Sequence, residues 1–146
     1  SGTVSAATEA TIEGVPAIAV SLNSFDNSDF GFSAKFGARL TKIVLKNGLP
    51  DGVALNVNIP AVPESEIKGV SITRQGKSRV IETFDKRVDP RNNTYYWMAG
   101  DMRFDEVDEE ADCSQVSNNY ISITPIQFDL TSYNTINELK KWNISI

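Results

Sequence analysis

Hydrophobic and polar residues follow two different periods along the N-terminal part of the chain. Residues 3–13 are rich in alanine and predict a helix. Ala6, Ala7 and Ala10 would give this helix a smooth face for close packing on a sheet. The apolar run PAIAVSL at 16–22 follows, and its continuous hydrophobicity is typical of a strand that is covered on both faces.

The next segment predicts a second helix and a second strand. Asn27 and Ser28 are the candidate caps of the helix. Apolar residues recur at helical spacing and would face the sheet, namely Phe32, Phe36, Leu40, Ile43 and Val44. The pair Asn47-Gly48 is typical of a helix end. Residues 53–59 then alternate with a period of two, which indicates a strand.

This helix–strand–helix–strand order predicts an α/β fold in which helices cover the faces of a parallel sheet. Parallel sheets usually contain more strands than the two that the pattern predicts here. We therefore expect further strands of this sheet to come from polypeptide upstream of Ser1.

The second half of the chain consists mainly of strand patterns. Short patterns at 69–74, 78–84 and 95–98 are separated by turn residues, so that 69–98 predict a long antiparallel arm. Residues 101–112 are dominated by Asp and Glu and predict a solvated linker.

One more strand and a terminal helix complete the predicted elements. Residues 120–124 alternate as in a strand, which Pro125 is expected to stop. Asn134 and Thr135 are the candidate caps of the last helix. One face of this helix would carry Ile136, Leu139 and Trp142. We expect three parts: an α/β core over 1–66, an extended β arm with its acidic linker over 67–112 that serves oligomerisation, and a strand and terminal helix over 113–146 that return to the core.

The composition excludes several kinds of catalytic site. The 146 residues include no histidine and one cysteine, Cys113. A Ser-His-Asp triad, an imidazole base and a cysteine-based metal site are therefore excluded within the chain. One cysteine cannot form an intramolecular disulfide, which favours a reducing compartment such as the cytoplasm. The formal net charge of −5 disfavours binding to nucleic acid polymers and anionic membranes, and no apolar run is long enough to span a bilayer.

The first three residues carry the strongest chemical signal. Ser1, Gly2 and Thr3 stand directly before a predicted helix, whose N-terminus has unpaired N–H groups and a partial positive charge. Glycine allows a ligand to approach the backbone closely, and the two hydroxyls can donate to phosphate oxygens. The same residues also fit an ordinary N-cap at Ser1 or Thr3, or a remnant of cloning at Ser1 and Gly2.

Three other clusters have a simpler alternative. The acidic residues of 101–112 suit a hard cation in type but lack the spacing of a calcium loop, so a solvated linker is favoured. Tyr95, Tyr96 and Trp97 fit base stacking, or more simply a core or interface patch. The excess of Lys and Arg over 74–91 fits a solvated arm as well as retention of anionic substrates.

Four stretches, in order along nearly the whole chain, resemble the SurE family of nucleotide phosphatases. They are SGTVSAATEATIEGVPAIAVSL at 1–22, LNVNIP at 55–60, GVSITRQGKSR at 69–79 and NNYISITPIQFDLT at 118–131. The resemblance implies that the chain is the C-terminal part of such a protein. Two departures leave the shape of the arm open: Asn119 stands where glycine is usual, and YYWMAG replaces the usual aromatic pattern.

The resemblance implies an incomplete Rossmann-like core and a divalent-metal-dependent phosphatase that acts on nucleoside 5′- or 3′-monophosphates. Ser1, Gly2 and Thr3 would be its phosphate-binding loop. The family's Asn-Asp-Asp-Gly and Ser-Gly-Ile-Asn motifs, which supply metal ligands, have no match in this chain. No metal ligand or catalytic residue is therefore assigned, and Mg²⁺ or Mn²⁺ would be held by an upstream N-terminal half of the same protein. The family also implies a homodimer or tetramer.

A second hypothesis is a non-catalytic module that pairs subunits through the aromatic arm. It predicts a folded oligomer that needs no upstream polypeptide. The phosphatase hypothesis instead predicts that the strand at 16–22 has an exposed edge.

Overall fold

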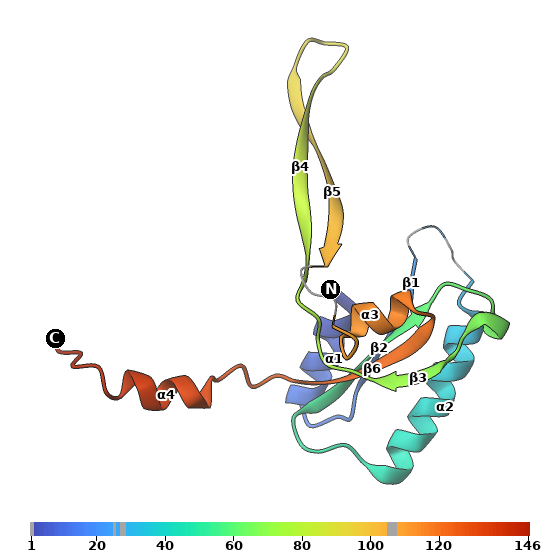
Figure 1. The fold of residues 1–146 in the computed structure, drawn as a ribbon, viewed down its shortest axis with the longest axis vertical. Coiled ribbons are helices and arrows are strands. Elements are labelled where there is room, and N and C mark those ends of the chain that lie inside the picture. The colour runs from blue at the N-terminus through green and yellow to red at the C-terminus, as the bar shows by residue number, and fades with distance from the viewer. Residues whose placement is uncertain (1, 25, 27–28, 105–107) are drawn as a thin grey trace.

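A computed structural model describes residues 2–24, 26, 29–104 and 108–146 of the chain. A four-stranded sheet forms its centre. Helix α1 (Gly2–Ile12) packs on one face, α2 (Gly31–Asn47) on the other, and α3 (Asp112–Ser117) over two of the strands. A two-stranded hairpin and a terminal helix extend from this body (Figure 1). The predicted α/β class with three layers is confirmed.

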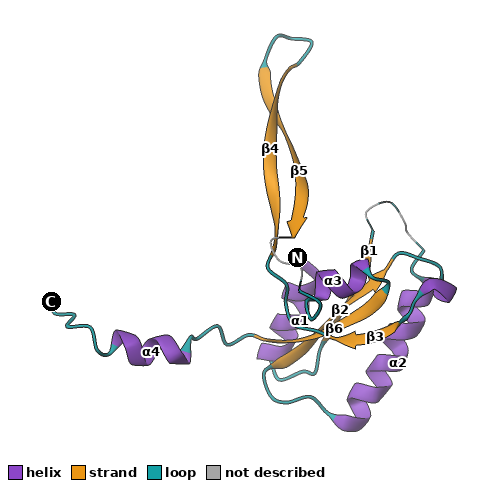
Figure 2. Cartoon of the chain, in the orientation of Figure 1, coloured by secondary structure: helices purple, strands orange, loops and turns teal. Residues whose placement is uncertain are grey.

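The central sheet combines parallel and antiparallel neighbours (Figure 2). Its strands are β1 (Ile18–Asn23), β2 (Val53–Pro60), β3 (Gly69–Ile72) and β6 (Tyr120–Gln127). They lie in the order β1-β2-β6-β3, with β1 parallel to β2, β6 antiparallel to β2 and β3 parallel to β6. Within the described residues β1 pairs on one side only, so it has the open edge that the sequence predicted.

Strand β6 continues through Pro125, where the sequence predicted that it would stop. Pro125 lies opposite Leu55 of β2, and the N–H of Leu55 donates to the carbonyl of Ala17 at 3.0 Å. The backbone groups of Leu55 therefore point away from β6. Pro125 occupies a pair without ladder hydrogen bonds, so its missing N–H removes none. Pairing with β3 ends before Pro125: Ile123 lies opposite Ile72, and its carbonyl accepts the N–H of Thr73 at 3.0 Å.

Small residues bring α1 close to the sheet. The cluster between them consists of Ala7, Ala17, Ala19 and Ala54. Ala6 was expected on this face but is exposed. Neighbouring positions of a helix are about 100° apart, and the buried stripe of α1 is centred near Ala7 and Thr11, so Ala6 points away from the strands.

The main hydrophobic core lies on the opposite face, under α2. Its buried centre consists of Val57, Ile59, Ile121 and Ile123. Phe32, Phe36 and Leu40 pack against it from the helix, as predicted. Ile43 was also expected there, but it is 49% exposed. Ile43 lies on the same side of the helix as Phe32 and Phe36 but further along, in the last turns of α2, where it does not reach the buried cluster.

Helix α2 begins at Gly31, with Phe30 at the N-cap position. The N–H of Gly31 donates to Oδ1 of Asp29 at 2.9 Å, which satisfies one donor of the first turn. The predicted caps Asn27 and Ser28 lie outside the described residues. The helix ends before Gly48, whose φ of 77° is favourable for glycine.

The arm is shorter and lies later in the chain than predicted. It consists of β4 (Ser78–Val88) and β5 (Thr94–Phe104), which pair antiparallel from Ser78 opposite Phe104 to Val88 opposite Thr94. Strand β3 belongs to the central sheet instead, because it pairs with β6. The acidic segment 101–112 is also not a plain linker, since 101–104 complete β5 and Asp112 begins α3.

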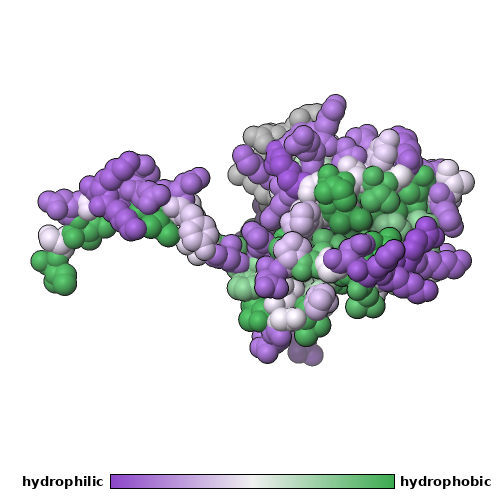
Figure 3. Space-filling model, turned by 90° about the horizontal axis from the view of Figure 1, so that it is seen from below, coloured by the Kyte–Doolittle hydropathy of each residue, from purple (hydrophilic) through white to green (hydrophobic). Residues whose placement is uncertain are grey.

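The terminal helix α4 (Tyr133–Leu139) does not return to the core, contrary to the sequence prediction. None of its residues is buried, and an extended segment after β6 carries it away from the sheet (Figure 1). Ser132 occupies the N-cap instead of Asn134 or Thr135. Apolar residues gather on one side of this extension (Figure 3), and Trp142 is 64% exposed.

We expect the start of α4 to loosen in acid. The carboxylate of Asp129 accepts the Thr131 N–H at 2.9 Å and the Tyr133 hydroxyl at 2.5 Å. Interactions with Thr131 and then Tyr133 lower the pKa of Asp129 from 3.8 to about 2. Because the folded-state pKa is lowered, this stabilisation is complete above pH 3.8 and is lost as the pH falls through about 2.

The Tyr133 ring resonances, followed by NMR during acid titration, should therefore move with a midpoint near 2. Asp129→Asn has no carboxyl group to titrate, so it should abolish the transition. A midpoint near the ordinary value of 3.8 would contradict the expectation.

Candidate functional site

The start of α1 is open to solvent at the carboxyl end of β1. Gly2 and Thr3 are both exposed, and Ser1 lies outside the described residues. A short connection through Gly14, which has a φ of 77°, reverses the chain between α1 and β1. The helix therefore runs antiparallel to the strand, and its first turn reaches the end of the sheet at which β1 and β2 both finish.

This first turn has the chemical properties of an anion site. It contains no acidic residue that would compete for the N–H groups. A Cβ atom at Gly2 would meet no other atom within 4 Å, so there is room above the backbone for a ligand. The Thr3 hydroxyl can add a donor beside the positive end of the helix dipole. Gly2 and Thr3 thus lie side by side in the exposed first turn of α1, as the phosphate-loop prediction requires. Their role in phosphate binding stays a prediction.

A cavity of about 470 Å³ lies at the same end of the sheet, beside the first turn of α2. Its walls include Leu22 at the end of β1, Ile59 and Pro60 at the end of β2, and Glu64 of the short helix η1 (Glu64–Glu66). Ligands of α/β sheets bind at the carboxyl ends of the strands. Local sequence patterns did not predict this cavity. The one signal was Ser33, a polar residue at helical spacing from Leu40 and Val44 on the sheet-facing side of α2.

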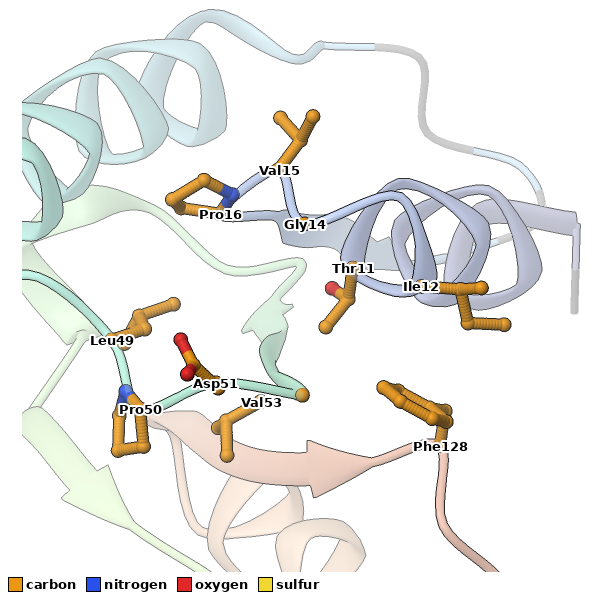
Figure 4. A pocket seen from close by; sticks show the side chains of 11 residues that line it. Thr11, Ile12, Gly14, Val15, Pro16, Leu49, Pro50, Asp51, Val53 and Phe128 are labelled. Carbon is orange, nitrogen blue, oxygen red and sulfur yellow. The ribbon is translucent and has the colours of Figure 1, made fainter.

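A second cavity, of about 260 Å³, lies at the opposite end of the sheet (Figure 4). Thr11 and Ile12 from the end of α1, Pro50 before β2 and Phe128 after β6 line it. Its walls are mostly apolar, and it faces the amino ends of β1 and β2. That position is not where α/β sheets bind their ligands.

The resemblance places the ligands of Mg²⁺ or Mn²⁺ in upstream polypeptide, so this metal stays a prediction. No three His, Cys, Asp or Glu side chains among the described residues lie close enough to hold a metal ion. Two acidic residues of the 101–112 segment have structural partners. Asp108 pairs with Arg74, and Asp112 accepts the N–H of Gly76 at 2.9 Å.

The aromatic cluster lies on the hairpin, not in the core. Tyr95, Tyr96 and Trp97 of β5 are 42%, 63% and 55% exposed. The guanidinium of Arg87 on β4 lies 5.2 Å from the centre of the Trp97 ring, a cation–π contact between the two strands near the tip of the arm. Of the two simple interpretations of this cluster, a core patch is therefore wrong and an interface patch stays a prediction.

Comparisons with known proteins agree on one family. The family model described as "Survival protein SurE" matches residues 1–82. The "5'-nucleotidase SurE" of Syntrophobacter fumaroxidans is 48% identical over 144 residues, which are 99% of this chain and 58% of that protein. The protein of the same description from Thermosynechococcus vestitus is 50% identical over 146 residues, which are 97% of this chain and 55% of that one. The chain thus spans somewhat more than half the length of these curated relatives.

A solved structure has the same fold. The SurE protein from Aquifex aeolicus superposes with a TM-score of 0.80 at 41% sequence identity, covering 96% of this chain and 56% of that one. In the part of the chain that the structure describes, no helix is long and apolar enough to cross a membrane. The matching family model, the relatives with which nearly the whole chain aligns and the shared fold together establish that the chain belongs to the SurE family.

Proposed function

We propose that the full-length protein carrying this chain is a metal-dependent phosphatase that hydrolyses nucleoside 5′- or 3′-monophosphates. The observation that carries the proposal is the exposed start of α1, with Gly2 and Thr3 at the carboxyl end of β1. Relatives described as 5'-nucleotidases, up to 50% identical, support the nucleotide substrate.

The role of this chain in the reaction is to hold the phosphate. The N–H groups of the first turn of α1, with the hydroxyls of Ser1 and Thr3, would donate to the phosphate oxygens. Such fixed donors stabilise the transition state most where negative charge increases. The metal, Mg²⁺ or Mn²⁺, would neutralise charge on the phosphate when bound. Its ligands would come from upstream polypeptide, where the resemblance places the metal-binding motifs of the family.

The purified 146-residue chain should therefore not hydrolyse nucleotides, whereas the full-length protein should do so with added metal. The measurement is phosphate release from AMP and 3′-AMP, with and without Mn²⁺ or Mg²⁺. EDTA should remove the activity of the full-length protein. Mn²⁺-dependent phosphate release by the isolated chain would contradict the division of roles.

We further propose that the protein is a cytoplasmic homodimer or tetramer that pairs through the hairpin. The support is the apolar surface that β4 and β5 expose, including Phe84, Tyr96 and Trp97. Exposed aromatic side chains of this kind are typical of protein interfaces. The same surface favours the second hypothesis, a non-catalytic pairing module. That hypothesis predicts an oligomer with no phosphatase activity in the full-length protein.

A further inference from the structure

The cavity beside α2 combines an apolar wall with a few polar groups, as ligand pockets commonly do. The apolar part comes from strand ends and the segment that follows β2, and includes Leu22, Ile59, Pro60 and Val62. The polar part includes Asp29, Ser33, Lys35 and Glu64. Its volume of about 470 Å³ lies within the range of pockets that enclose small organic ligands.

One hydroxyl in the cavity lining lacks a hydrogen-bond partner. Ser33 is only 6% exposed, and its Oγ forms no hydrogen bond with any residue that the structure describes. Leaving a buried hydroxyl without a partner is unfavourable, and such groups are uncommon in folded proteins. A ligand that bonded to this hydroxyl would satisfy it, so Ser33 indicates the side of the cavity where a polar ligand group would sit.

The walls of the cavity are held in place before any ligand binds. Pro60 is the last residue of β2 and is paired with Asn23 of β1. Pro63 precedes η1, where its carbonyl accepts the N–H of Glu66 at 2.8 Å. The two prolines restrict the backbone on either side of Ala61 and Val62. Binding to such a preorganised wall costs little conformational entropy.

The charges in the lining indicate which part of a nucleotide fits. Asp29 and Glu64 outnumber Lys35, so the lining is net negative and disfavours a phosphate. Carboxylates instead accept hydrogen bonds from sugar hydroxyls, as they do from the ribose in dinucleotide-binding folds. The apolar wall of Pro60 and Val62 suits the face of a base. The lining therefore matches the neutral part of a nucleotide.

We propose that this cavity binds the nucleoside portion of the substrate. The ribose hydroxyls donate to Glu64, the Ser33 hydroxyl bonds to the ribose, and the base lies against Pro60 and Val62. This inference rests on the proposed nucleotidase function and assigns the nucleoside to the α2 face of the sheet, separate from the phosphate at the start of α1.

The experiment compares Ser33→Ala, Glu64→Gln and the matched control Glu66→Gln in the full-length protein. Glu66 lies on the same short helix as Glu64 but does not line the cavity. Binding of adenosine, which has no phosphate, is measured by calorimetry. The kinetics of hydrolysis are measured with AMP and with p-nitrophenyl phosphate, which has no nucleoside.

Ser33→Ala and Glu64→Gln should each raise the Kd for adenosine and the KM for AMP about five- to tenfold, the loss expected for one hydrogen bond. The KM for p-nitrophenyl phosphate and the properties of Glu66→Gln should not change. Ser33→Ala removes an unpaired buried hydroxyl, so its thermal midpoint should not fall, which separates lost binding from lost folding.

Unchanged adenosine binding in both cavity variants, or equal effects on AMP and p-nitrophenyl phosphate, would overturn the assignment. Failure of the proposed function has a different signature, because the wild-type protein would then hydrolyse neither phosphate ester. The adenosine titration still tests the cavity in that case, since it requires no catalysis.

Discussion

Replacing Thr3 with valine in the full-length protein should lower kcat/KM for a nucleoside monophosphate about 10- to 100-fold, a little less than the loss of a main oxyanion donor. Valine keeps the shape of threonine and removes only the hydroxyl. The backbone N–H groups of the first turn of α1 remain, so activity should fall but not vanish. The effect should appear in kcat as well as in KM, because the charge and geometry of the phosphate oxygens change in the transition state, and the hydroxyl is a donor fixed beside them.

Two variants control for other effects of the change. Thr3→Ser keeps a hydroxyl at the same position and should retain most of the activity. Thr11→Val removes a hydroxyl from the far end of the same helix, where it donates to the carbonyl of Ala7 at 2.9 Å, and should leave the kinetics unchanged. Because Thr3 is exposed, its variants should unfold within about 0.5 kcal/mol of the wild type. Wild-type kinetics in Thr3→Val would remove the hydroxyl from the mechanism.

Gly76→Ala should lower the free energy of unfolding by about 1–3 kcal/mol, the usual cost of overpacking. Gly76 lies where the chain leaves the core to enter the hairpin. A Cβ atom there would lie 2.7 Å from Sγ of Cys113, 3.0 Å from Oδ1 of Asp112 and 3.3 Å from Cβ of Ala111. The same glycine donates its N–H to Asp112, so moving the backbone to relieve the contact would lengthen that hydrogen bond.

The double variant Gly76→Ala/Cys113→Ala tests the cause, because it removes the atom in closest contact. Its free energy of unfolding should be higher than the value obtained by adding the effects of the two single changes. Gly37→Ala is the matched control, since its Cβ would lie 3.5 Å from Val20, which is ordinary contact, and alanine favours the helix. Urea unfolding measures all four variants.

The two glycine variants also differ in what they should do to assembly. If pairing depends on the orientation of the hairpin, light scattering should show fewer oligomers for Gly76→Ala than for the wild type. Gly37→Ala should form oligomers as the wild type does. If Gly76→Ala were as stable as Gly37→Ala, the close packing between the hairpin root and α3 would be refuted.

The elements of the core could be predicted from local patterns. Alanine content identified α1, the apolar stripe identified α2, and the apolar run and the alternating run identified β1 and β2. Each depends on residues that are neighbours in the chain, so periodicity is enough. The error at Ala6 concerns which side of α1 is buried, and the error at Ile43 concerns how far along α2 the sheet extends; both depend on the position of the sheet.

Strand partners could not be predicted in this way. Strand β3 reads as the beginning of an arm, yet it pairs with β6, which follows it by about fifty residues. The extension of β6 through Pro125 depends on the hydrogen bond from Leu55 to Ala17, a contact between two other segments. The candidate site also has one part that the sequence predicted and one part that only the tertiary structure shows. The resemblance predicts Ser1, Gly2 and Thr3 as a phosphate loop, whereas the cavity at Ser33 and Glu64 exists only where separate segments meet.

The sequence by itself determined the helices and strands of the core, because each is encoded in residues close together in the chain. It also indicated the family, through four stretches in the same order as in SurE proteins, and with it the phosphate-loop prediction. Tertiary structure alone decided the sheet order, the root and direction of the hairpin, the departure of α4 from the core and the cavity beside α2. The physical reason is that pairing and enclosure depend on free energies between distant segments, which no local pattern of side chains contains.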